Sequence, residues 1–246
     1  MQRNRFPGRV EVFEVGPRDG LQNEPTFIAT AEKVRFTNLL TEAGCRRIEV
    51  TGFVHPKWVP QMADAREVLS AITKRAGVLY NALIPNLTGL DRAIEAGLAG
   101  VVTIMSASES HNIKNLNMGV AASLEAIEQI NQVAAAHGIQ VRSYIATAYG
   151  CPIEGPVPPG RVAEIASALE GFGSCEVSLG DTTGMASPVS AYAVGCLVKQ
   201  RLKTASLAVH FHQAGGSEFA NVLASMEAGI DTIDSAAGGL GGCPCA

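Results

Sequence analysis

Short runs of apolar and β-branched residues alternate along the chain with segments of helical periodicity. Valine, isoleucine and threonine are frequent in these runs, and such residues favour strands over helices. Turn residues, most often glycine, bound many of the segments. Eight runs fit this description, and we expect strands at residues 10–15, 47–51, 78–84, 101–105, 140–147, 175–179, 207–211 and 231–235.

Between the expected strands, apolar residues recur at the spacing of one helix face. Phe36, Leu39, Leu40 and Ala43 stand at i, i+3, i+4 and i+7, and Gly44 follows as a stop signal. The same spacing recurs in six other segments. We therefore expect seven helices, whose periodic residues span 36–43, 68–72, 90–94, 124–134, 162–169, 189–197 and 219–226.

This alternation predicts right-handed parallel βαβ units. Two closures are open to such units: a (β/α)8 TIM barrel or an open doubly wound sheet. Eight strands and a length of 246 residues favour the barrel, and no GxGxxG follows the first strand. We expect one catalytic domain over residues 1–246, with the eighth helix and the C-terminal cap missing. Either the chain is truncated, or another chain covers the eighth strand.

Composition excludes several classes of protein. The net charge is −4 without blocks of like charge, so nucleic acids and anionic membranes are poor candidates for partners. No segment approaches the roughly 20 apolar residues of a membrane helix, and the N-terminus lacks the apolar core of a secretory signal. The six cysteines show neither CxxC nor zinc-finger spacing. We read them as reduced thiols and expect a cytoplasmic protein.

Candidate chemistry gathers where strands should end, which is the catalytic face of a TIM barrel. His210 and His212 are two residues apart in an expected strand, so both side chains point to one face. With Asp19, which follows the first strand, they form a plausible divalent-metal site. The alternative is that the two histidines are unrelated and that one of them faces a helix.

Other polar residues at these strand ends have both functional and structural interpretations. Arg18 and Asp19 form either a site or an ion pair that stabilises a turn. Glu49 stands in an apolar strand, where a carboxylate must be paired or functional. Asp181 is either a site residue or a helix cap. Cys243 lies among glycines and is a candidate reactive thiol, whereas three other cysteines look like core residues: Cys45, Cys175 and Cys196.

Several longer stretches resemble the 3-hydroxy-3-methylglutaryl-CoA lyase family. They are VEVFEVGPRDGLQNE, IEVTGFVHPKWVPQMAD, SLGDTTGMASP, AVHFH and GGLGGCP, in the order and spacing of that family. The likeness covers essentially the whole chain. The motif RDG alone would indicate only the wider group of metal-dependent barrels that make or break bonds next to an enolate.

The resemblance implies a TIM barrel with Mg²⁺ or Mn²⁺ at its mouth, held by Asp19, His210 and His212. Arg18 would stabilise a thioester enolate, and Cys243 would transfer a proton from a mobile loop. Two supporting polar residues would be Glu49 and Asp181. The implied reaction cleaves an acyl-CoA thioester, 3-hydroxy-3-methylglutaryl-CoA, to acetyl-CoA and acetoacetate, as in leucine degradation or ketone-body formation. A homodimer is a further expectation.

The sequence departs from that family at several positions. The family's metal-contacting asparagine would lie beyond residue 246. Gln213 and Ala214 replace an Asp-Thr pair, and Pro25 stands where many members have lysine. Gly52 and His55 replace residues that are often serine near the acyl pocket. Two alternatives therefore stay open: a lyase for another branched 3-hydroxyacyl-CoA, and an inactive fragment or binding barrel.

Overall fold

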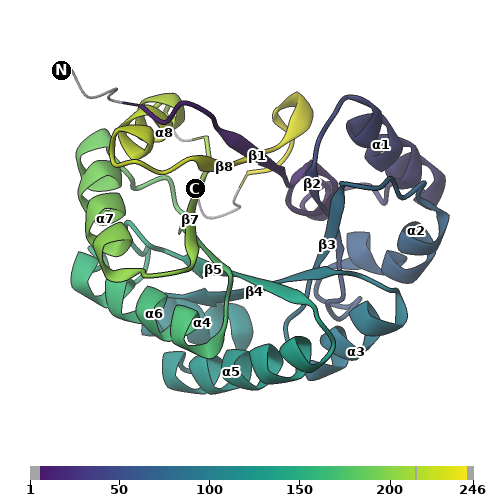
Figure 1. Cartoon of the computed structure of the whole chain (residues 1–246), viewed down its shortest axis with the longest axis horizontal. Coiled ribbons are helices and arrows are strands. Elements are labelled where there is room, and N and C mark those ends of the chain that lie inside the picture. The colour runs from purple at the N-terminus through teal and green to yellow at the C-terminus, as the bar shows by residue number, and fades with distance from the viewer. Residues whose placement is uncertain (1–5, 214, 243–246) are drawn as a thin grey trace.

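Eight parallel strands pair in sequence order, and β8 pairs with β1 to close a barrel (Figure 1). The computed structural model describes residues 6–213 and 215–242. All eight expected strands are present, with boundaries that shift by at most two residues. They are β1 (Glu11–Glu14), β2 (Arg47–Gly52), β3 (Leu79–Leu83), β4 (Gly100–Ser106), β5 (Gln140–Ala146), β6 (Glu176–Asp181), β7 (Ser206–Phe211) and β8 (Thr232–Ser235). The TIM-barrel prediction is confirmed.

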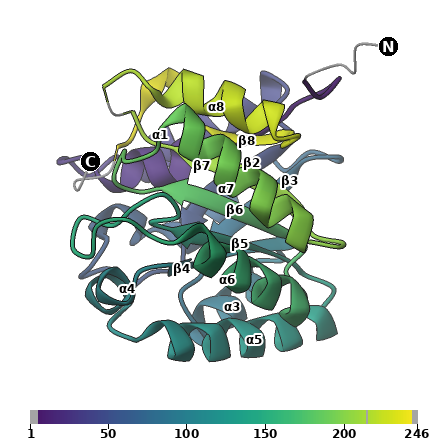
Figure 2. The same ribbon diagram turned by 90° about the vertical axis from the view of Figure 1, so that its left-hand side faces the viewer.

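Helices surround the outside of the barrel, as two perpendicular views show (Figures 1 and 2). Each of the seven expected helices is present. In the described residues the α-helices are α1 (Thr30–Glu42), α2 (Ala65–Ala71), α3 (Leu87–Glu95), α4 (Glu109–Leu116), α5 (Val120–Ala136), α6 (Pro159–Phe172), α7 (Pro188–Arg201) and α8 (Glu218–Glu227). Three short turns accompany them: η1 (Gly16–Gly20), η2 (Pro60–Met62) and η3 (Ala237–Gly239).

Helix α5 shows how the apolar pattern fixes an element in this fold. Ile127, Ile130 and Ala134 recur on one face and are buried beneath the helix. The helix gives way to Gly138, whose φ of 67° is costly for any residue with a Cβ. The apolar stripe therefore sets the face of the helix, and the glycine sets its end.

Helix α4 was not expected from the sequence. The side chain of Ser108 caps its first turn by accepting a hydrogen bond from the His111 amide, and the helix ends at Asn117 with φ 56°. Its buried residues, His111 and Asn112, are polar. An apolar stripe is therefore missing, and only the cap residues signal this helix.

The barrel interior is divided between an apolar layer and a charged layer. The apolar layer includes Phe13, Leu83, Val102 and Tyr144. The charged layer joins buried carboxylates to guanidinium groups, and Arg142 is 2% exposed at its centre. Larger apolar clusters lie outside the strands, where the helices pack. Side chains thus fill the barrel interior, and we expect any reaction to take place at the mouth.

The outer face of β1 is partly open to solvent. Among the described residues only the short turn η3 follows β8, and Figure 1 shows it as the yellow coil between α8 and α1. Val12 on β1 is accordingly 46% exposed. Among the described residues, η3 is thus the only helical element after β8.

The cysteine interpretation was partly wrong. Cys175 is exposed, contrary to expectation, and Cys45 and Cys196 are only partly buried. Cys45 nevertheless packs against an apolar core cluster. Cys151 is the one fully buried thiol among the four described, and all four are free. Cys175 starts the run into β6 at the end of the barrel that faces away from the mouth, where its side chain meets solvent. None of the described helices is both long and apolar enough to cross a bilayer.

Candidate metal centre at the barrel mouth

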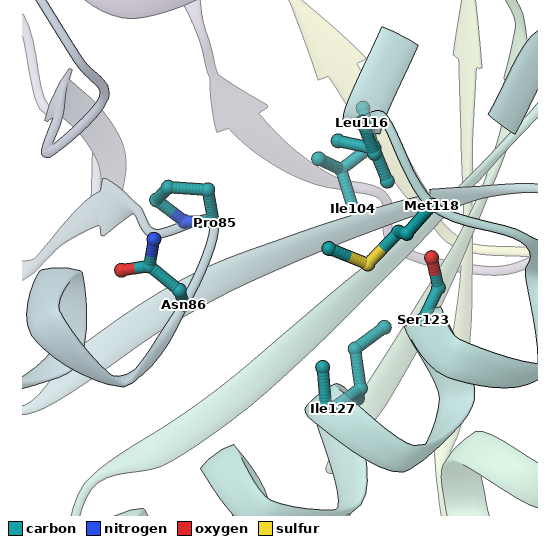
Figure 3. A pocket seen from close by; sticks show the side chains of 8 residues that line it. Pro85, Asn86, Ile104, Leu116, Met118, Ser123 and Ile127 are labelled. Carbon is teal, nitrogen blue, oxygen red and sulfur yellow. The ribbon is translucent and has the colours of Figure 1, made fainter. Parts of the chain in front are cut away.

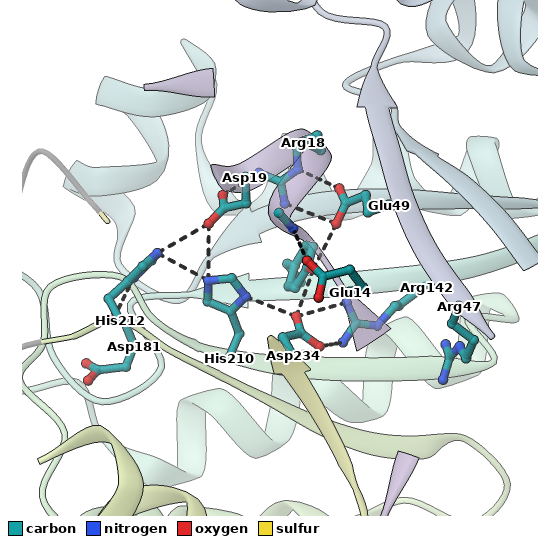
Figure 4. Close-up of polar contacts among 12 residues, drawn as sticks. Glu14, Arg18, Asp19, Arg47, Glu49, Arg142, Asp181, His210, His212 and Asp234 are labelled. Carbon is teal, nitrogen blue, oxygen red and sulfur yellow. Dashed lines mark hydrogen bonds and ion pairs between the residues drawn. The ribbon is translucent and has the colours of Figure 1, made fainter. Parts of the chain in front are cut away.

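Asp19, His210 and His212 meet at the carboxyl ends of β1 and β7 (Figure 4). One ligand atom from each lies within 4.8 Å of the others. Asp19 Oδ2 is 3.5 Å from His210 Nε2 and 3.6 Å from His212 Nε2, and the two Nε2 atoms are 3.2 Å apart. The strand period therefore predicted correctly that both rings share one face. The reading of two unrelated histidines is excluded.

The turn η1 places Arg18 and Asp19 side by side. The carbonyl of Val15 accepts amide hydrogen bonds from Arg18, Asp19 and Gly20, at 3.1, 2.7 and 3.3 Å. The last of these closes the wide ring of a π-type turn, a local feature frequent at functional sites. The turn follows β1 directly, so both side chains project over the mouth of the barrel.

The glycines of this turn are required by close packing rather than by backbone angle. Neither Gly16 nor Gly20 has a positive φ. A Cβ on Gly16 would lie 2.6 Å from Glu14 Oε1, and one on Gly20 would lie 2.9 Å from the Cβ of Leu240. A side chain at Gly20 would therefore push the turn away from Leu240, whereas one at Gly16 would displace the Glu14 carboxylate.

Arg18 is held by two carboxylates. Its Nε donates to Glu49 Oε1 at 2.7 Å, Nη2 donates to Glu49 Oε2 at 3.2 Å, and Nη1 donates to Asp19 Oδ1 at 2.6 Å. Burial opposes the charge of the guanidinium, but Glu49 and Asp19 outweigh it and raise the pKa of Arg18. The expectation that Glu49 must be paired is confirmed, and the Arg18–Asp19 ion pair exists within the site.

The two oxygens of Asp19 have different surroundings. Oδ1 accepts hydrogen bonds from Arg18 and, at 2.9 Å, from Gln22, whereas Oδ2 faces the two histidines. Burial acts to raise the pKa of Asp19, but Arg18 and the histidines hold it well below the ordinary value. The carboxylate is therefore anionic, and one oxygen is directed at the histidine nitrogens.

Each histidine ring is fixed through its Nδ1 atom. His210 Nδ1 lies 3.0 Å from Asp234 Oδ2, and His212 Nδ1 lies 3.0 Å from the main-chain carbonyl of Asp181. Both partners are acceptors, so we assign a hydrogen to Nδ1 in each ring, and in the neutral form of each ring the Nε2 lone pair faces Asp19. Burial opposes protonation of His210, but Asp19 and Asp234 raise its pKa to about 9.

These donors fit a divalent cation. Two imidazole nitrogens and one carboxylate oxygen form a common ligand set for such ions. Ligand bonds of about 2.1 Å at right angles put neighbouring donor atoms roughly 3 Å apart, and the three separations here are 3.2, 3.5 and 3.6 Å. The site therefore needs only a small contraction to hold the ion.

The two remaining predicted site residues are Asp181 and Cys243. The Asp181 carboxylate accepts from the Ala186 amide at 3.1 Å, so it stabilises the β6–α7 loop, and its backbone carbonyl is what contacts His212. Burial raises the pKa of Asp181. Cys243 lies outside the described residues. The loop before it packs on η1, and Asn23 Nδ2 donates to the carbonyl of Gly242 at 2.7 Å.

Sequence reasoning missed a buried polar network behind His210. Asp234 accepts from Arg142 and from the hydroxyl of Tyr144, and Arg142 also donates to Glu176. Tyr144 also lies 3.0 Å from Glu49, so the network links both halves of the site. The available signal was the presence of charged residues inside expected strands. Arg142 and Tyr144 alternate in one such run, which puts both side chains on one face.

A separate cavity of about 130 Å³ lies between β3, β4 and the start of α5 (Figure 3). Ile104, Leu116, Met118 and Ile127 provide most of its apolar wall, and Asn86 and Ser123 supply polar atoms. No acidic, basic or cysteine side chain lines it. The cavity therefore offers shape and apolar surface rather than a reactive group.

Comparisons with known proteins agree with this site. The family model described as HMGL-like matches residues 9–244. Hydroxymethylglutaryl-CoA lyase YngG of Bacillus subtilis is 44% identical over 241 residues, which cover 98% of this chain and 81% of that protein. This chain belongs to the hydroxymethylglutaryl-CoA lyase family. The mitochondrial hydroxymethylglutaryl-CoA lyase of Bos taurus is also 44% identical, over 98% of this chain and 74% of its own length.

Solved structures of the hydroxymethylglutaryl-CoA lyase family share the fold closely. The Pseudomonas aeruginosa enzyme superposes with a TM-score of 0.94 at 43% identity, over 98% of this chain and 80% of that one. An enzyme from Acinetobacter baumannii, in complex with coenzyme A and 3-methylmalate, superposes at 0.92 with 38% identity, over 100% of this chain and 80% of that one. Membership in a family of lyases makes this chain an enzyme, and the HMGL-like family depends on a divalent metal.

Proposed function

We propose that this chain cleaves 3-hydroxy-3-methylglutaryl-CoA to acetyl-CoA and acetoacetate, using Mg²⁺ or Mn²⁺. The observation that carries the proposal is the meeting of Asp19, His210 and His212 beside the Glu49-anchored Arg18. The names of the relatives support the substrate and the reaction. The donor set supports a hard divalent cation, which favours the carboxylate oxygen alongside imidazole nitrogens.

Asp19, His210 and His212 would hold the cation. When bound, it would lower the pKa of the substrate's 3-hydroxyl and polarise nearby oxygens. Before the C2–C3 bond breaks, the 3-hydroxyl would release its proton to solvent water, and C3 would then become the ketone carbon of acetoacetate. The bonding electron pair passes to C2 and forms the enolate of acetyl-CoA.

Arg18 would stabilise the negative charge that develops on the thioester oxygen. Its guanidinium is buried and is fixed by Glu49 on two nitrogens, so it is already oriented before the substrate binds. Asp181 would support the site by holding His212 through its main-chain carbonyl. Both roles use groups whose positions are set by the ends of strands.

Cys243 would protonate C2 of the enolate and so complete acetyl-CoA. Residues 240–242 just before it pack against Gly20 and Asn23, which follow β1. This packing supports the assignment because it brings the glycine loop to the same turn that carries Arg18. Loop closure would exclude water while the enolate exists.

The test is turnover of 3-hydroxy-3-methylglutaryl-CoA with Mn²⁺, followed by the release of acetoacetate. His210→Ala is expected to abolish the activity. A panel of other branched 3-hydroxyacyl-CoA thioesters tests the alternative substrate. Absence of turnover with every thioester would contradict the proposed function and support a binding barrel.

Cellular location and assembly belong to the same proposal. We propose a cytoplasmic homodimer acting in leucine degradation. The free state of the four described cysteines supports a reducing compartment. The relatives include mitochondrial enzymes and a cytoplasmic one from Rattus norvegicus. Cell fractionation and analytical ultracentrifugation test location and assembly, and a monomer in sedimentation would contradict the dimer.

A further inference from the structure

Asp234 is the most heavily bonded side chain next to the candidate metal centre (Figure 4). It lies on β8, and its side chain is 1% exposed. Oδ1 accepts from Arg142 Nη2 at 2.5 Å. Oδ2 lies 3.0 Å from His210 Nδ1, 2.8 Å from the Tyr144 hydroxyl and 3.2 Å from Arg142 Nη1. Such a carboxylate cannot rotate without breaking several bonds.

The bond to His210 has a consequence for the opposite side of the ring. A carboxylate oxygen facing Nδ1 requires a hydrogen on that nitrogen. In the neutral ring, which is the form that binds a cation, Nε2 then carries the lone pair, and it points toward Asp19 Oδ2 and His212 Nε2, at 3.5 and 3.2 Å. Asp234 therefore selects both the tautomer and the orientation that a metal ligand needs.

The two histidines differ in the partner that fixes them. His212 donates to a neutral carbonyl of Asp181, whereas His210 faces a buried carboxylate. A carboxylate makes the imidazole a stronger donor to a cation than a carbonyl does. His210 is therefore the histidine whose ligand strength depends on a side chain that mutation can remove.

We propose that Asp234 is a positioning residue of the metal centre, which fixes His210 with Nε2 toward the cation and strengthens it as a ligand. The inference rests on the proposed function, since it assumes that the cation binds at Asp19, His210 and His212. It assigns to β8 a part in the site, although β8 carries none of the three ligands.

A purely structural role makes a different prediction. Asp234 also pairs with Arg142, and Glu176 pairs with the same guanidinium at 2.5 Å without touching His210. If Asp234 served only to neutralise Arg142, removing either negative charge would affect the metal centre equally. Glu176→Gln is therefore the matched control for Asp234→Asn.

The experiment measures Mn²⁺ affinity of the purified full chain from the electron paramagnetic resonance signal of free Mn²⁺. Asp234→Asn is expected to weaken binding about 10–100-fold, the usual effect of losing such a partner. Glu176→Gln is expected to bind Mn²⁺ within about threefold of the wild type, since it leaves the His210 contact intact. Unchanged affinity in Asp234→Asn, or an equal loss in both variants, would overturn the inference.

A second measurement keeps the inference testable if Asp234→Asn does not fold. In the Mg²⁺-loaded wild type with ¹⁵N-labelled histidine, the His210 signals are identified by their loss in His210→Gln. Nδ1 of His210 is expected to carry the hydrogen, and a bare Nδ1 would overturn the inference. Wild-type protein that binds no Mn²⁺ would overturn it together with the metal centre. Mn²⁺ binding without thioester turnover would refute only the lyase activity.

Discussion

Asn23 and Gly242 are joined by a hydrogen bond of 2.7 Å from Nδ2 to the main-chain carbonyl, although 219 residues separate them. Asn23 follows the turn that carries Arg18 and Asp19, and Gly242 precedes the candidate thiol Cys243. Beside this bond, Leu240 packs against Gly20. The contact therefore ties the two ends of the barrel sequence together at the mouth.

Removing this bond is expected to reduce catalysis more than metal binding. Asn23→Ala should lower kcat about fivefold or more, because a net hydrogen bond contributes roughly 1 kcal/mol and here positions the glycine loop. Mn²⁺ affinity should stay within about twofold, since the Asn23 side chain donates to the Gly242 carbonyl and not to one of the three ligand residues. Steady-state kinetics and Mn²⁺ titration check both values.

Asn38→Ala is the control for that variant. Asn38 accepts one hydrogen bond from the Thr73 amide on the outside of the barrel. Asn38→Ala therefore also removes one hydrogen bond, but far from the mouth. Its kcat should match the wild type. An unchanged kcat in Asn23→Ala would show that the bond does not serve the reaction.

Glu49→Gln is expected to reduce kcat about a hundredfold, because Arg18 loses the charge that fixes its guanidinium in place. The buried arginine would also lose its main counter-charge, so thermal stability should fall. Mn²⁺ binding should change far less, as Glu49 is not one of the three ligands. Circular dichroism melting, kinetics and Mn²⁺ titration separate these effects.

Arg18→Lys is an independent test of the Arg18–Glu49 pair. Lysine keeps the charge but cannot bond both oxygens of Glu49 in a fork. The kcat of this variant should therefore fall while Mn²⁺ still binds. Wild-type turnover in Arg18→Lys would show that the fork geometry is unimportant.

Metal removal is expected to abolish activity reversibly. Dialysis against EDTA should stop acetoacetate formation, and added Mn²⁺ or Mg²⁺ should restore it. His212→Ala should not recover with either ion, because the variant lacks the imidazole whose Nε2 lies 3.6 Å from Asp19 Oδ2. His137→Ala, at an exposed histidine after α5, should behave as the wild type. Full activity after exhaustive chelation would contradict a metal-dependent reaction.

Glu176 should make stability sensitive to acid. Burial opposes its ionisation, but Arg142 and Arg47 outweigh this and lower its pKa. A carboxyl whose folded pKa lies below its unfolded value of about 4.3 stabilises the fold above that pH, and this contribution is lost as pH falls through the folded pKa. The wild type should therefore lose its advantage over Glu176→Gln progressively below about pH 4.

Urea unfolding at several pH values tests this. Near pH 7, Glu176→Gln should lower the free energy of unfolding by about 3–5 kcal/mol, since the buried guanidinium of Arg142 and the partly buried one of Arg47 lose a partner. Glu95→Gln is the control, because its pair with Arg66 is exposed, and its cost should stay within about 0.5 kcal/mol. A pH-independent difference between Glu176→Gln and the wild type would contradict the linkage.

The sequence by itself determined the strands, most helices and the three candidate ligands. These features depend on local periodicity, which the chain carries in every segment. A two-residue period puts His210 and His212 on one face whatever else the fold does. A 3.6-residue apolar stripe ending at glycine likewise defines a helix such as α5. The resemblance to a known family then supplied the chemistry for these positions.

Only the tertiary structure decided which distant side chains complete the site. Closing β8 against β1 sets Asp234 beside Phe13 in register and within reach of His210 and Arg142. No local pattern specifies a partner 92 residues away, because such pairing depends on the register of the whole barrel. The exposure of Cys175 depends on the tertiary structure in the same way. The residue precedes β6 at the end of the closed barrel that faces away from the mouth, where its side chain meets solvent.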